Sequence, residues 1–327
     1  MDSIEAPFRY PRVRPDAPVL RRNDDEVQIG LPGQPALILL ARAPIEKLLV
    51  LADGCHHLHE IRRRAPQLGV ETRLLDSSLR LLQQAGLVAE AELERPALAE
   101  RRLRLVGAGS MARPLAELLV AAGIGVLHIS DEQPVDPAVY PSAGVAASMA
   151  EALRGLLARS ASTPEPRTAV RVADHWSKPE HLQTDLTVVA CDAPEPDRVV
   201  AAHLMRLDRP HLFLRVNGAG AVVGPLVVPG QTACLNCTDL VRRDHDRAWP
   251  TLLGQLSRIR MTPDPVSAQW AASVAATQVL AFLYGARPQT LGATLEVRPP
   301  GFALEVRRWP QHPGCGCAWG FTAQWSP

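Results

Sequence analysis

Four cysteines in two close pairs are the residues of this chain whose types and spacing point most directly to chemistry. The first pair is Cys234-Leu-Asn-Cys237, and the second, near the carboxyl end, is Cys315-Gly-Cys317. Thiolate sulfurs are preferred zinc ligands, and four of them complete its tetrahedral coordination and leave no open position for a reacting water. We therefore expect Cys234, Cys237, Cys315 and Cys317 to hold a structural zinc ion that ties the carboxyl-terminal segment to its domain. Two disulfides, or four unrelated thiols, are the alternative.

A glycine-rich turn is the second group of residues with chemical potential. The apolar stretch 102–106 runs into Gly107-Ala-Gly109-Ser-Met-Ala112, and after a helix-like segment a second apolar stretch ends at Asp131. A G-x-G-x-x-A turn with an acidic residue about 20 positions further on is typical of a dinucleotide-type βαβ unit. The pattern predicts a Rossmann-like domain with Gly107, Gly109 and Asp131 at its nucleotide position. The ligand stays open, because the same unit serves many functions.

Composition and charge exclude several classes of protein. The chain has 327 residues and a net charge of +1, so it is long enough for two domains and has no strong attraction to nucleic acid or anionic lipid. It contains no apolar run of about 18 residues that would span a membrane. Its first residues, MDSIEAPFRYPRVRPD, lack the apolar core of a signal peptide. We expect a cytoplasmic protein with reduced cysteines that binds neither nucleic acid nor membrane.

A charged, proline-containing stretch at 89–102 predicts the boundary between a domain at 1–95 and a second domain at 96–327. The pattern before it predicts a small α+β winged helix. Its strands are expected at 19–21, 27–29, 36–40 and 87–88, and its helices from Pro44, at 58–65 and at 71–85. Glu71 and Asp76 balance the charges of Arg73 and Arg80 on the last helix, which disfavours DNA binding by this helix.

This first segment resembles the PqqD-like peptide-recognition domain of enzymes that modify ribosomal peptides. The resemblance covers residues 19–89 and rests on the apolar strand, the helix that runs into Leu51-Ala-Asp-Gly54, and the two helices that end in Gln-Ala-Gly86-Leu-Val. It implies that an extended peptide adds a strand to the sheet edge and lies against the 71–85 helix. The implied edge residues are Leu37, Ile38, Leu39 and Leu40. An ordinary winged helix that packs on a neighbour or binds DNA is the alternative.

After the glycine turn, strands and helices alternate. Further strands are expected at 169–172, 186–190 and 212–216, a glycine-rich hairpin at 218–230, an alanine-rich helix at 266–284, and final strands at 291–297 and 303–308. The hairpin leads directly into the first cysteine pair, and the final strands lead into the second. We therefore predict a second domain of the α/β class.

Over residues 100–320 the chain resembles the ThiF/MoeB fold of the ubiquitin-activating-enzyme-like superfamily. The matching features are the glycine turn, Asp131, Val-Val-Ala-Cys-Asp192 at a strand end, Arg198 on the next helix, and the hairpin before Cys-x-x-Cys. The resemblance implies a Rossmann-like ThiF-type mixed sheet with a zinc knuckle, and a homodimer formed through this domain. Asp192 stands at a position similar to that of the magnesium-binding aspartate of the superfamily.

The phosphate-binding residues of active superfamily members are missing here. Those enzymes have a G-x-G-G-x-G turn, followed by an asparagine, an arginine and a lysine that neutralise the triphosphate. In this chain Ser110 and Ala112 replace two of the glycines, and residues 132–144 contain no arginine or lysine. We expect no use of ATP or magnesium and no catalytic residues, so Gly107, Gly109, Asp131 and Asp192 would form a vestigial nucleotide site.

A PqqD-like domain fused to a ThiF-like domain without adenylation activity resembles the cyclodehydratase partner proteins of azoline peptide biosynthesis. The resemblance implies a protein that binds the leader of a ribosomal precursor peptide and presents its core to a YcaO-type ATP-dependent enzyme. One alternative is an adenylyltransferase of the ThiF/MoeB type that activates a carrier protein or a peptide C-terminus with ATP. Another is a scaffold outside any peptide-modifying pathway.

Overall fold

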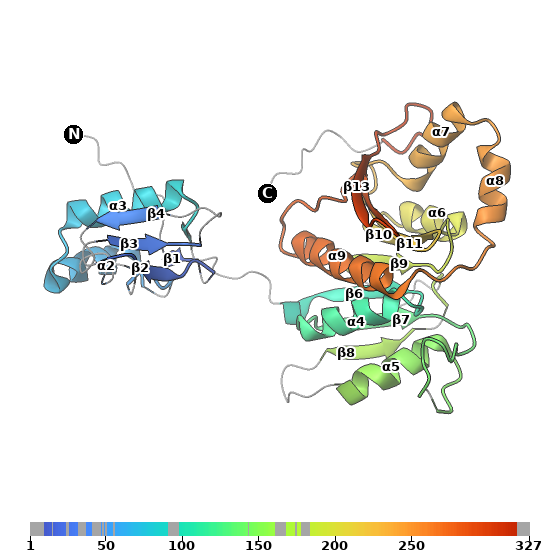
Figure 1. Cartoon of the computed structure of the whole chain (residues 1–327), viewed down its shortest axis with the longest axis horizontal. Coiled ribbons are helices and arrows are strands. Elements are labelled where there is room, and N and C mark those ends of the chain that lie inside the picture. Colours follow the sequence, from blue (N-terminus) through green and yellow to red (C-terminus); the bar gives the residue numbers. More distant parts are fainter. Residues whose placement is uncertain are drawn as a thin grey trace. The chain divides into compact units, whose positions relative to one another are not determined.

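The computed structural model consists of two compact units, Met1–Glu94 and Arg95–Pro327 (Figure 1). It describes residues 10–14, 16–23, 26–31, 37–40, 47, 49, 51–54, 56–90, 98–142, 144–160, 168–173, 175–177 and 184–318.

The amino-terminal unit combines two small antiparallel sheets with helices. Its elements are β1 (Pro11–Val13), β2 (Val19–Arg21), β3 (Glu26–Ile29), β4 (Leu37–Leu40), α2 (Leu58–Arg64), the 3-10 helix Ala65–Leu68, α3 (Thr72–Gln84) and β5 (Val88–Glu90). The sheets have the orders β2-β3-β4 and β1-β5. Strand β1 was not predicted, because three residues carry too little pattern, and it forms by pairing with β5. The helix predicted from Pro44 lies outside the described residues, apart from helical Lys47, Leu49 and Leu51.

The core of this unit forms between β3 and α3. Val27 and Ile29 alternate along β3 and are fully buried. Leu75, Leu79 and Leu82 recur at helical spacing on α3 and belong to the same apolar cluster. The apolar face of β3, which repeats every two residues, therefore packs on the apolar stripe of α3, which repeats every 3.6 residues.

The carboxyl-terminal unit is built on one eight-stranded mixed sheet (Figure 1). Its strands are β6 (Arg102–Val106), β7 (Val126–Ser130), β8 (Ala169–Val172), β9 (Leu186–Ala190), β10 (His211–Asn217), β11 (Gly220–Val227), β12 (Ala293–Arg298) and β13 (Ala303–Arg308). Its helices are α4 (Ala112–Ala121), α5 (Met149–Ser160), α6 (Arg198–Arg206), α7 (Leu235–His245), α8 (Trp249–Leu256) and α9 (Pro265–Leu283).

The order of the sheet is β13-β12-β11-β10-β9-β6-β7-β8. The strands from β8 to β10 pair in parallel, and β11, β12 and β13 add to them as antiparallel strands. Because the carboxyl ends of parallel strands meet at one edge, the turns after β6, β7 and β9 lie side by side there. The predicted mixed α/β fold class is confirmed.

Helices cover both faces of this sheet. Leu103 and Leu105 of β6 share one apolar cluster with α4, α5 and α9, whereas Val189 and Phe213 point into a second cluster with α6, α7 and the cysteines. Helix α9 has the length and mean hydropathy of a membrane-spanning helix, but half of that window is buried in the unit. Its small alanines pack closely against α4 and β11, so α9 is the core helix of the unit.

Candidate functional site

The glycine turn joins β6 to α4 at the carboxyl edge of the parallel strands. Gly107 has a φ of 97°, which favours glycine, and a Cβ atom there would lie 2.0 Å from the carbonyl oxygen of Ala190. The turn therefore passes close to the end of β9, and it brings Gly109 next to Asp192, which follows Ala190 by two residues.

Two backbone amide groups of this turn donate hydrogen bonds to carboxylates of the chain itself. The Ala108 backbone N–H donates to Asp131 Oδ2 at 2.7 Å. Ser110 donates to Asp192 from its backbone N–H at 3.4 Å and from its hydroxyl at 3.1 Å. A Cβ atom on Gly109 would lie 1.9 Å from Asp192 Oδ2, so this carboxylate rests directly on the turn. The position where such a turn receives an anion is therefore filled by the protein's own acids.

Burial raises the pKa of Asp192, and the hydrogen bonds from Ser110 together with the nearby charge of Arg260 act in the opposite direction. Arg260 precedes α9, where the Met261 N–H donates to the carbonyl oxygen of Asp192 at 3.0 Å. Arg260 could not be expected from the segment after Asp131, because it approaches from a part of the chain that is distant in sequence.

Arg198, the arginine on α6 that the sequence comparison singled out, is held by several acceptors of the protein. Its Nε and Nη2 atoms donate to the two oxygens of Asp239 on α7 at 2.7 and 2.8 Å. Nη2 also donates to Glu195 at 2.7 Å, and Glu195 accepts from Arg242 of α7 at 2.8 Å. These partly buried charge-assisted bonds clamp α6 to α7. The guanidinium of Arg198 is therefore committed to structure.

The four cysteines of the two pairs form one compact cluster. Their Sγ atoms all lie within 4.8 Å of one another. The Sγ atom of Cys234 is 3.9 Å from that of Cys237 and 3.5 Å from that of Cys315, and those of Cys237 and Cys317 are 3.3 Å apart. Four sulfurs around zinc at about 2.3 Å would be about 3.8 Å apart. The cluster can thus hold a metal ion, and its geometry suits tetrahedral zinc.

The charges of these thiols also fit a metal ion. The hydrogen bond from Cys234 lowers the pKa of Cys237 to about 4. Burial raises the pKa of Cys317 to about 12, and its contacts with Cys237 act in the same direction. Four thiolates in this space would repel one another, so they need a divalent cation to share. Trp309 is buried in the apolar cluster that contains Cys234, Cys237 and Cys317.

Leu37, Ile38, Leu39 and Leu40, the predicted peptide-binding residues, form β4. This strand pairs with β3 in antiparallel register from Glu26↔Leu40 to Ile29↔Leu37. It stands at the end of the sheet order, and among the described residues no strand pairs with its outer edge. An outer edge of this kind has backbone groups available for another strand.

Comparison with known proteins identifies the fold. No protein-family model matches the chain, and no curated protein matches its sequence. Solved structures do match. The crystal structure of E. coli MccB with ATP has a TM-score of 0.68 at 16% identity and covers 94% of this chain and 99% of MccB. The chain has the fold of MccB. This confirms the predicted ThiF/MoeB-like fold.

Two further solved structures extend the comparison. The microcin C7 biosynthetic enzyme MccB in complex with N-formylated MccA has a TM-score of 0.68 at 16% identity and covers 94% of this chain and 99% of MccB. The heterocyclase TruD has a TM-score of 0.58 at 17% identity, and the match covers 95% of this chain but 43% of TruD. At these identities the likeness concerns the fold.

Proposed function

We propose that this chain is a leader-peptide-binding partner protein that presents a ribosomal precursor peptide to a YcaO-type cyclodehydratase and has no adenylation activity of its own. The observation that carries this proposal is the glycine turn. Its Ala108 and Ser110 amides donate to Asp131 and Asp192, where a nucleotide-using enzyme would offer them to phosphate.

The electrostatics of the turn disfavour ATP. A phosphate placed there would displace Asp192 and break its two hydrogen bonds from Ser110. Each carboxylate about 4 Å from a phosphate charge costs about 4 kcal/mol at an effective dielectric of about 20. The nearby charge of Arg260 acts in the opposite direction, and Arg198 is held by Asp239 and Glu195.

The peptide-binding part of the proposal rests on β4 and on the solved structures of similar fold. An outer sheet edge binds an extended peptide through backbone hydrogen bonds, while side-chain pockets give selectivity. MccB is known in complex with N-formylated MccA, and TruD is a heterocyclase. Both support a peptide partner in ribosomal peptide modification. In this proposal the cysteine cluster holds a structural zinc ion, in the cytoplasm where thiols stay reduced.

A proline scan of β4 tests the proposal in the full chain. The probe is a fluorescent synthetic peptide with the leader sequence encoded nearest to the gene for this chain. Successive residues of a strand direct their N–H groups to opposite edges, so Ile38→Pro and Leu39→Pro remove N–H groups on opposite sides of β4. We expect one variant to lose its pairing with β3 and unfold the unit. The other should keep its circular dichroism spectrum and lose at least about tenfold in peptide affinity, since it removes a bond to the peptide. Equal affinity of this folded variant and the wild type would refute the proposal.

Adenylation remains the second candidate function, because Arg260 lies near Asp192 and MccB has been solved with ATP. It predicts ATP–pyrophosphate exchange in the presence of a carrier protein or of the precursor peptide. The exchange should be abolished in Asp192→Ala. ATP–pyrophosphate exchange that depends on Asp192 would overturn the non-catalytic assignment. If no exchange occurs with any candidate carrier protein or peptide, adenylation is excluded as the function.

A further inference from the structure

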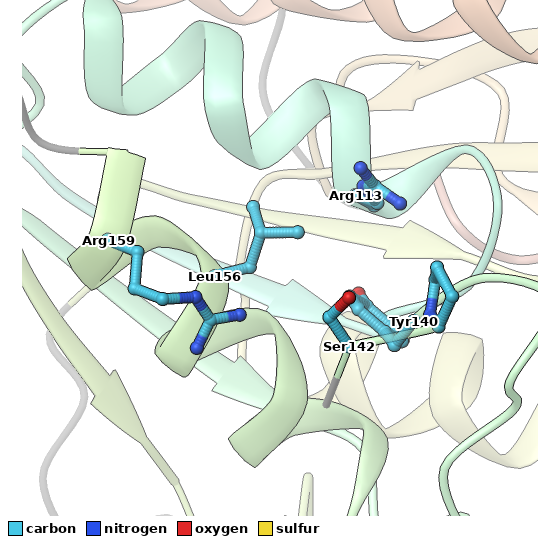
Figure 2. Close-up of a pocket in the computed structure, with 6 residues that line it drawn as sticks. Arg113, Tyr140, Ser142, Leu156 and Arg159 are labelled. Atoms are coloured by element: carbon cyan, nitrogen blue, oxygen red, sulfur yellow. The ribbon is translucent and has the colours of Figure 1, made fainter. Parts of the chain in front are cut away.

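A small cavity lies between α4, α5 and the connection that follows β7. Its volume is about 130 Å³, and it is lined by Arg113, Tyr140, Pro141, Ser142, Leu156 and Arg159. Figure 2 shows Arg113 coming from α4, Leu156 and Arg159 from α5, and Tyr140 and Ser142 from the connection. The Tyr140 hydroxyl donates to the Ala108 carbonyl oxygen at 2.7 Å, so the tyrosine stands between the cavity and the glycine turn.

The two arginines of the cavity are held in different ways. Arg113 donates to the Val139 carbonyl oxygen at 2.6 Å and to Glu117 at 3.4 Å, which fixes its guanidinium at the cavity wall. Arg159 has no hydrogen-bond or ion-pair partner among the described residues. A Cβ atom on Gly155 would lie 3.4 Å from Arg159 Nη1, so the absence of a side chain there leaves room for the guanidinium beside α5.

The size and walls of the cavity select the ligand. Pockets for drug-sized molecules measure about 300–1,000 Å³, so a space of about 130 Å³ suits a side chain or a chain end better than a whole nucleotide. Pro141 and Leu156 provide apolar walls for a hydrocarbon stem. A planar guanidinium fork pairs well with a planar carboxylate, and the Ser142 hydroxyl adds a donor.

We propose that this cavity binds the carboxylate of a peptide, with Arg159 as its main charge partner and Arg113 as its fixed wall. The carboxylate belongs either to the C-terminus of the peptide or to an acidic side chain. The inference rests on the proposed function in one respect, namely that a peptide is the ligand of this protein.

The test uses small probes on the full chain, so that it does not depend on leader binding at β4. N-acetylglycine carries the carboxylate of a peptide end, and N-acetylglutamic acid α-amide carries that of a side chain. Saturation-transfer NMR gives their dissociation constants for the wild type, for Arg159→Gln and for Arg154→Gln. Arg154 is the matched control, because it is exposed on the same helix and does not line the cavity.

We expect each carboxylate probe to bind Arg154→Gln with the same affinity as the wild type. Each should bind Arg159→Gln at least about tenfold more weakly, because one charge-assisted hydrogen bond is lost. The tighter of the two probes identifies the source of the carboxylate. Equal binding to wild type and Arg159→Gln, equal binding of the neutral N-acetylglutamine α-amide, or tighter binding of inorganic phosphate would each overturn the assignment. A chain that binds these probes and ignores the leader peptide would retain the cavity assignment and refute the proposed function.

Discussion

Replacing Gly109 with alanine tests directly whether Asp192 occupies the glycine turn. The backbone of Gly109 is not in the left-handed region, so alanine is conformationally acceptable and its effect is steric. The new Cβ atom would lie 1.9 Å from Asp192 Oδ2, 2.7 Å from Cγ and 3.0 Å from Oδ1. The whole carboxylate must therefore move, and its hydrogen bonds from Ser110 are lost.

The expected cost combines these two effects. Overpacking of this kind costs about 1–3 kcal/mol, and a hydrogen bond to a charged group contributes about 1.5–3 kcal/mol. Because the two are coupled and partly relieve each other, we expect about 3 kcal/mol in total. In a unit the size of Arg95–Pro327, this lowers Tm by about 6–12 °C in differential scanning calorimetry. Gly254→Ala, a helical glycine with nothing within 4 Å of the new Cβ, is the control and should leave Tm unchanged or slightly higher.

A double-mutant cycle with Asp192→Ala provides the refutation. The alanine at 192 removes all three atoms that Gly109→Ala would meet, so the second substitution should cost less than about 0.5 kcal/mol in that background. If Gly109→Ala lowers Tm equally with and without Asp192, or does not lower it at all, the carboxylate does not rest on the turn. Asp192 would then not block a nucleotide at the turn.

Three further predictions follow from the cysteines and a buried histidine. Metal analysis of the purified chain should find one zinc ion per chain, which Cys317→Ser loses and Cys191→Ala retains, since Cys191 lies outside the cluster. Burial raises the pKa of Cys191 to about 12, so iodoacetamide at pH 8.5 should modify it only after unfolding in urea. Burial lowers the pKa of His211 to about 4, below its unfolded value of about 6.5, so its contribution to stability is present above pH 6.5 and lost as pH falls toward 4. His211→Gln should therefore flatten the fall of the urea midpoint between pH 7 and 4.5, and an unchanged slope would contradict this assignment.

Much of the fold could be predicted from local patterns. Runs such as Leu186–Ala190 are mostly apolar because parallel strands are buried on both faces, and the leucines of α3 recur at helical spacing. Strand β1 escaped prediction, since it depends on pairing with β5 rather than on its own residues. The spacing of the two cysteine pairs also predicted that the four thiols come together, because two such pairs suit one tetrahedral zinc ion.

The chain's amino-acid sequence by itself determined the class of the fold, the order of its longer elements, and the residue types at the glycine turn and cysteine pairs. Only the tertiary structure decided what those residues touch. The parallel sheet brings Asp192 onto Gly109, the segment before α9 brings Arg260 near that carboxylate, and α7 takes Arg198 into an ion pair with Asp239. These partners are distant in sequence, and their contacts depend on how the helices pack on the sheet. Local propensity carries no information about such packing, because it acts over a few residues whereas electrostatic and steric contacts act through space.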